Sequence, residues 1–139
     1  MISGAPRATL LAAVVANVLG WVLPAISEER GFEAFFVALS PLWDYRHFQN
    51  EGLGLIAFIV SSALTNVLFI VLAAVLAFGP ARRAKPVLWA AAAATLLNLY
   101  WPILLEDDRV RLEPGFFIWV SSFVLLALTA FLAHRSSPR

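Results

Sequence analysis

The residues with the clearest potential for chemistry surround His47. Asp44 precedes His47 by three residues and Glu51 follows it by four, and a histidine beside a carboxylate can act as a general base. The same residues are equally typical of a solvated loop in which His and Arg meet lipid phosphates. The second histidine, His134, lies beyond the last apolar run and offers no partner. We favour the loop and predict no catalytic residue, and an outer-face membrane enzyme using His47 stays as an alternative.

Metal and cofactor chemistry has little support in the sequence. The run Glu106-Asp107-Asp108 lacks the spaced ligands and the glycine turn of a dedicated calcium loop. The chain has no cysteine, which excludes disulfides and thiolate metal sites. A net charge of +1 without a basic patch indicates no nucleic-acid partner. We therefore predict neither a metal site nor a cofactor.

The composition points to lipid as the solvent of this chain. Of the 139 residues, 61% are hydrophobic and 14% are charged, and the mean hydropathy is +0.83. A soluble domain is about 45–50% apolar and about 25% charged. So few polar residues cannot cover an apolar core in water. We expect one integral membrane domain over residues 1–139.

Four apolar runs are long enough to cross a bilayer. They cover residues 8–26, 55–78, 87–105 and 116–133. About 20 helical residues span the hydrocarbon core, and an isolated backbone in lipid must satisfy its own hydrogen bonds. These runs therefore predict an all-α protein with four transmembrane helices. The third run is the least apolar, because it contains the block Ala90 to Ala94, and we expect it to be buried among its neighbours.

The first run also has a second interpretation. Arg7, an apolar stretch and Leu23-Pro24-Ala25 resemble the parts of a cleaved signal peptide. The apolar stretch is longer than usual for such a peptide, and small residues at 12, 16 and 20 form a stripe suited to helix packing in lipid. We favour a retained helix.

The charges predict how the chain is threaded. The loop 79–86 contains Arg82, Arg83 and Lys85, and with the two ends it holds six of the ten basic residues and none of the nine acidic ones. Positively charged loops stay in the cytoplasm. We expect an up-down-up-down bundle with both termini in the cytoplasm and outer loops at 27–54 and 106–115. Nine of the ten basic residues are Arg, which favours a bacterial protein of the inner membrane.

A short helix is expected within the first outer loop. Phe32, Phe35, Phe36 and Leu39 recur with the spacing of one helical face. Ser40-Pro41 should end this helix, because a residue before proline avoids the helical region. The pattern predicts an amphipathic helix that lies on the outer membrane face or folds over the mouth of the bundle.

Each predicted span carries a polar or small face. Polar residues spaced by three, four or seven positions share one side of a helix, and they should point inward because an amide facing lipid lacks a partner. They form what we term the polar seam: Asn17, Ser62, Thr65, Asn66, Thr95, Asn98 and Ser122. The seam serves either as interhelical hydrogen bonding or as the lining of a path for a solute. We favour hydrogen bonding.

Taken together, these features predict a non-enzymatic membrane protein. No ionisable residue lies in the central part of any span, and such residues mark most proton and ion pathways. Our first hypothesis is an accessory or assembly subunit whose partners are membrane lipids and either other membrane subunits or further copies of itself. The alternative is a small homo-oligomeric channel or transporter, with a path lined by Asn17, Asn66 and Asn98.

Overall fold

The computed structural model describes residues 4–44, 52–104 and 111–136 and is built mainly from helices. Within these residues, four helical segments are long and apolar enough to cross a membrane. They are α1 (Ala5–Val22), α3 (Leu53–Phe78), the span Ala84–Ile103, which combines α4 (Ala84–Asn98) with most of α5 (Trp101–Leu104), and α6 (Pro114–Arg135). The expectation of four apolar helices is confirmed. They identify the chain as a multi-pass membrane protein.

The helix ends differ from the expected ones where local chemistry intervenes. Helix α1 ends at Val22, four residues before the expected boundary, because Leu23 is extended ahead of Pro24. Residues 24–26 form a strand instead. Helix α4 ends at Asn98, and a separate turn of helix, α5 (Trp101–Leu104), covers the rest of the third run. Helices α3 and α6 each begin two residues earlier than expected, with Pro114 in the first turn of α6.

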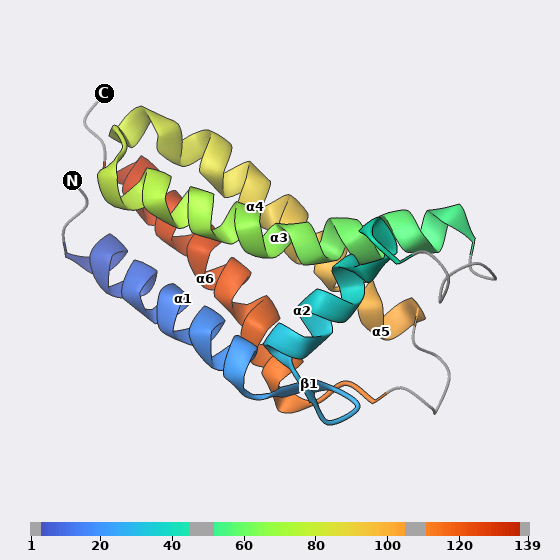
Figure 1. Ribbon diagram of the computed structural model, residues 1–139. Coiled ribbons are helices and arrows are strands. Elements are labelled where there is room, and N and C mark those ends of the chain that lie inside the picture. The colour runs from blue at the N-terminus through green and yellow to red at the C-terminus, as the bar shows by residue number, and fades with distance from the viewer. Residues whose placement is uncertain (1–3, 45–51, 105–110, 137–139) are drawn as a thin grey trace.

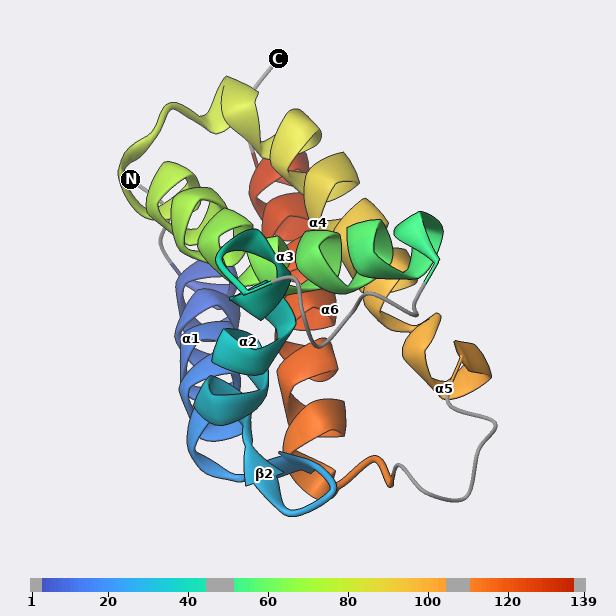
Figure 2. The ribbon, with the colours of Figure 1, turned by 45° about the vertical axis from the view of Figure 1, so that its right-hand side comes forward.

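Helices α1 and α4 run along α6, whereas α3 crosses them obliquely (Figures 1 and 2). The start of α1, the turn between α3 and α4 and the end of α6 lie at one end of the molecule (Figure 1). That turn contains the short helix η3 (Ala81–Arg83). At the other end lie the connection from α1 to α2 (residues 23–30), α2 (Gly31–Leu39) and α5 (Figures 1 and 2). Helix α6 is the centre of the bundle, because both α1 and α4 pack along it.

Small residues let α1 and α6 approach closely. A side chain added at Gly20 would meet Cβ of Trp119 at 2.5 Å. The face of α1 turned toward α6 buries Ala13, Asn17 and Gly20, whereas Ala12 is exposed and Ala16 is half-buried. The packing stripe is therefore 13, 17 and 20, on the face of the predicted seam residue Asn17, and positions 12 and 16 lie off it.

The main core lies in the half of the bundle near the chain ends. Its fully buried side chains include Phe123, Leu126 and Ala130 of α6, and the ring of Phe69 from α3 meets that of Phe123 edge to face at 5.3 Å. A second, smaller cluster of Ala25, Phe116 and Val120 lies at the opposite end. Much of the outer surface is apolar, for example Leu11, Ile70 and Leu96. Such a surface suits contact with lipid.

A small β-structure, which sequence patterns did not indicate, lies at the end of the bundle opposite the chain termini (Figure 1). Strand β1 (Pro24–Ile26) pairs antiparallel with β2 (Glu29–Arg30), and Ile26 also bridges to Leu112 ahead of α6. Ser27 and Glu28 form the turn with positive φ angles of 47° and 72°. The hairpin thus ties the end of α1 to the start of α6.

Helix α2 is found where the phenylalanine spacing predicts a helix. The backbone N–H of Arg30 donates to the carboxylate of Glu33 at 2.8 Å, which fixes its first turn. A short 3-10 helix, η1 (Ser40–Leu42), follows it. Phe35 faces the bundle and stacks on Trp21 at 5.1 Å, Leu39 is half-buried, and Phe32 and Phe36 are exposed.

Candidate functional site

All seven residues of the polar seam are buried inside the single chain. Their exposed fractions range from 0% for Asn98 and Ser122 to 9% for Thr95. They come from all four long helices. Among the described residues, no buried side-chain nitrogen or oxygen lacks a hydrogen-bond partner. The seam is thus a set of satisfied internal contacts.

Asn66 of α3 connects three helices. Its Oδ1 accepts the indole N–H of Trp21 at 2.9 Å and that of Trp119 at 2.8 Å. Its Nδ2 donates to the backbone carbonyl of Ala63 at 3.1 Å, within the same helix. Two accepted bonds occupy both lone pairs of the amide oxygen. One side chain of α3 therefore holds an indole from α1 and another from α6.

A closed ring of hydrogen bonds joins α3 to α4. Ser62 Oγ donates to Asn98 Oδ1 at 2.7 Å, and Asn98 Nδ2 donates to Thr65 Oγ1 at 3.1 Å. Thr65 Oγ1 then donates to the carbonyl of Ser62 at 2.6 Å. The indole of Trp101 adds a fourth bond, to Ser62 Oγ at 2.7 Å.

The remaining seam residues act separately. Asn17 Nδ2 of α1 donates to Ser122 Oγ of α6 at 3.1 Å, and Ser122 donates in turn to the carbonyl of Trp119 at 2.6 Å. Thr95 bonds only within its own helix, to the carbonyl of Ala91 at 2.8 Å. The structure therefore brings six of the seven residues into contacts between helices and leaves Thr95 outside them.

Next to Asn66 and Ser62 lies a cavity of about 60 Å³. Helices α1, α2, α3, α5 and α6 and strand β1 all contribute to its wall. Most of that wall is apolar, and none of its side chains is charged. The lining residues are Gly20, Trp21, Ala25, Ile26, Gly31, Ala34, Phe35, Ala38, Ser62, Ala63, Asn66, Trp101, Phe116 and Trp119. We refer to this cavity as the indole pocket.

The three indoles of the pocket are the feature that sequence analysis missed. Trp21, Trp101 and Trp119 have the positions of interfacial aromatic residues, and in the structure they are half-buried and donate inward. Trp43 and Trp89 are 64% and 66% exposed. Their spacing could have indicated that they point inward. Trp119 precedes the seam residue Ser122 by three positions and Trp21 follows Asn17 by four, so each indole shares a helix face with a seam residue.

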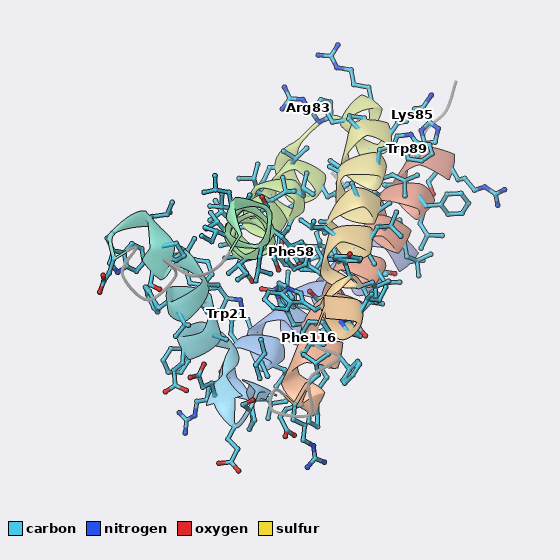
Figure 3. All side chains as sticks on the ribbon, turned by 90° about the vertical axis from the view of Figure 1, so that its right-hand side faces the viewer. Trp21, Phe58, Arg83, Lys85, Trp89 and Phe116 are labelled. Carbon is cyan, nitrogen blue, oxygen red and sulfur yellow. The ribbon has the colours of Figure 1, made fainter. Side chains whose placement is uncertain are left out.

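The basic turn lies far from the pocket. Figure 3 shows Arg83, Lys85 and Trp89 at one end of the molecule, whereas Trp21, Phe58 and Phe116 lie toward the middle and the opposite end. Arg82, Arg83 and Lys85 are all exposed. These cations are placed to meet water or headgroups and do not contribute to the pocket.

Some candidate residues lie outside the described part of the chain. His47, Glu51 and the run Glu106-Asp107-Asp108 fall there, so the outer-face enzyme hypothesis stays a prediction. Within residues 4–44, 52–104 and 111–136, no three His, Asp or Glu side chains gather as metal ligands would.

No protein-family model matches this sequence, and comparisons with curated proteins and with solved structures find no match either.

Proposed function

We propose that this chain is a non-enzymatic accessory or assembly subunit that docks laterally onto another protein in the membrane. The observation that supports this proposal is how the polar groups are used. The described seam residues bond one another, their own helix or the indoles of the pocket, and they leave no unsatisfied buried atom. The lateral surface is apolar. What the subunit offers a partner is therefore the outer face of its helices.

The same observation weighs against the channel or transporter alternative. A path between copies of this chain would be lined by outward-facing groups, but Asn17, Asn66 and Asn98 are 8%, 7% and 0% exposed. A path through one copy would have to break the ring formed by Ser62, Asn98 and Thr65. Hydrogen bonds between membrane helices contribute about 0.6 kcal/mol each on average, which suits a role in fixing helix register.

The outer face of α4 is our candidate docking surface. Trp89, Ala93 and Leu96 follow one another at helical spacing and are exposed, whereas Tyr100 lies beyond the end of α4 and packs its ring against Phe58 of α3. The span Ala84–Ile103, which contains α4, has the lowest mean hydropathy of the four spans in the described part of the chain, 1.2 against 1.4 for α1, 2.5 for α3 and 2.3 for α6. Such a weakly apolar helix suits protein neighbours better than lipid, yet its outer side has none within the chain. Ala93, a small residue between the larger Trp89 and Leu96, permits close approach of another helix.

For the membrane arrangement, we propose up-down-up-down threading in the bacterial inner membrane with both termini in the cytoplasm. Five of the seven described basic residues, Arg7, Arg82, Arg83, Lys85 and Arg135, belong to segments at one end of the bundle, and Arg30 and Arg111 belong to the other end (Figure 1). The acidic residues Glu28, Glu29, Glu33 and Glu113 belong to segments at the other end. This asymmetry supports a cytoplasmic basic end. Helix α2, with Phe32 and Phe36 exposed, would lie at the outer interface.

Site-specific photocrosslinking tests the docking surface. A photoreactive residue at Leu96 of α4 should crosslink to a discrete protein that co-purifies stoichiometrically in mild detergent. The matched control is the same residue at Ile70 of α3, which is similarly exposed (64% against 70%). Crosslinks to lipid alone at both positions, together with a protein that purifies without a partner, would contradict the proposal. A crosslink between two identical chains would identify the partner as a second copy.

A further inference from the structure

The indole pocket has a wall that offers a ligand almost no hydrogen bonds. The indole N–H groups of Trp21 and Trp119 both donate hydrogen bonds to Asn66, and that of Trp101 donates one to Ser62. Asn66 Oδ1 thus accepts two bonds, and Ser62 Oγ both accepts and donates. Apart from the second N–H of the Asn66 amide, ring carbon and methyl groups are the main surface a ligand would meet. We propose that the pocket binds the end of one hydrocarbon chain of a membrane lipid.

The absence of charge on the wall selects the tail of the lipid over its headgroup. None of the lining residues is Asp, Glu, Lys, Arg or His. A phosphate or ammonium group there would lose its hydration without gaining a partner, which is strongly unfavourable. An alkyl chain has no hydration to lose when it leaves one apolar environment for another, and the contacts it gains with close-packed rings offset the ordering of the chain.

The size of the pocket fits a chain end. The pocket is partly open, and its volume of about 60 Å³ is several times the roughly 10–15 Å³ that one water needs. It is also smaller than the roughly 150 Å³ of an apolar cavity that admits benzene. A narrow, flexible group fits better than a ring. Ala34 and Ala38, on the pocket side of α2, keep this space open.

A pocket among membrane-spanning helices has lipid chains available to it as ligands. The surrounding helices are long and apolar enough to cross a membrane, so lipid chains surround the protein at high concentration. The inference rests on this membrane location and is independent of any docked partner. Its failure and the failure of the docking proposal are therefore distinguishable.

Quenching of tryptophan fluorescence by brominated lipid tests the proposal. Trp43 and Trp89 are exposed and are first replaced (W43F/W89F), which leaves the three pocket indoles of the five tryptophans in the chain. The protein is reconstituted in dioleoylphosphatidylcholine vesicles with an increasing fraction of the dibrominated analogue. In the same background, Ala38→Phe fills the pocket, and Ala34→Leu fills it more mildly. Ala74→Phe is the matched control on the exposed face of α3.

We expect brominated chains to quench the W43F/W89F protein, the control to behave identically, and A38F and A34L to lose most of the quenching. Each variant should first show unchanged helical circular dichroism. Equal quenching in the filled and unfilled proteins would overturn the proposal, because bromine would then reach the indoles only from the outer surface. Protection of the fluorescence by tetramethylammonium, but not by added unbrominated lipid, would also overturn it in favour of an aromatic cage for organic cations.

Discussion

Trp21 and Trp119 donate their indole N–H groups to the same atom, Oδ1 of Asn66, at 2.9 and 2.8 Å. The donors come from the first and last helices and the acceptor from α3. Direct contacts between α3 and these two helices are otherwise few. One amide oxygen is therefore a main link between α3 and the α1–α6 pair.

Replacing Asn66 by Leu should destabilise the protein. Both indoles would keep their apolar surroundings but lose their common acceptor, and a buried unsatisfied donor costs about 1 kcal/mol or more. We expect a loss of about 2 kcal/mol in the free energy of unfolding, measured by denaturant titration in detergent. The control is Thr95→Val, whose hydroxyl bonds only its own helix. An equal loss in both variants would contradict the role of Asn66 as a link.

Gly20→Ala should separate α1 from α6. The added methyl would lie 2.5 Å from Cβ of Trp119, and overpacking of this kind typically costs about 1–3 kcal/mol. The midpoint of thermal unfolding in detergent should fall accordingly. Gly54→Ala provides the contrast, because nothing lies within 4 Å of its new methyl and α3 gains a better helix former. A Gly20→Ala protein as stable as the wild type would show that α1 and α6 can move apart freely.

Glu28→Gly should stabilise the hairpin. Glu28 has a φ of 72°, a conformation that costs most residues about 1–2 kcal/mol and costs glycine little. Part of this gain is offset by the greater freedom of glycine in the unfolded chain, so we expect a small rise in the unfolding midpoint. Glu29→Gly, in strand β2, should instead lower it. A fall in both variants would contradict the strain at Glu28.

Single cysteines should report the proposed threading without interference, because the chain has none of its own. A membrane-impermeant maleimide added to intact cells should label Ser27→Cys in the hairpin and fail to label Ser136→Cys after α6. Both positions are exposed at opposite ends of the bundle. After cell lysis both should react. Labelling of Ser136→Cys alone in intact cells would reverse the assignment of inside and outside.

Sequence patterns were sufficient for the long elements. An apolar run as long as residues 55–78 must satisfy its own backbone hydrogen bonds in lipid, and a helix does so. The phenylalanine spacing of residues 32–39 is a local property of a helix. The hairpin escaped prediction because strands of two and three residues show no periodicity. Its pairing with Leu112 also depends on a segment distant in the chain.

The candidate site was only partly predictable for a related reason. Helical spacing places Asn17, Asn66 and Asn98 on inward faces, but it does not say which residue each one meets. Interfacial tryptophans and inward-donating tryptophans have the same sequence signature at the end of a helix. The pairing of Trp101 with Ser62 and of Trp21 with Asn66 appears only when the helices are assembled.

The contact between Asn17 and Ser122 has a consequence for biosynthesis. The two residues are separated by 105 positions, which a ribosome translates in about 5 to 20 s at 5–20 residues per second. During that time the first helix is already made. The Ser122 hydroxyl that accepts from Asn17, and most of the surface of α6 against which the first helix packs, do not yet exist. The nascent chain must therefore shelter Asn17 in water, in the insertion machinery or against a temporary neighbour until the final helix is released.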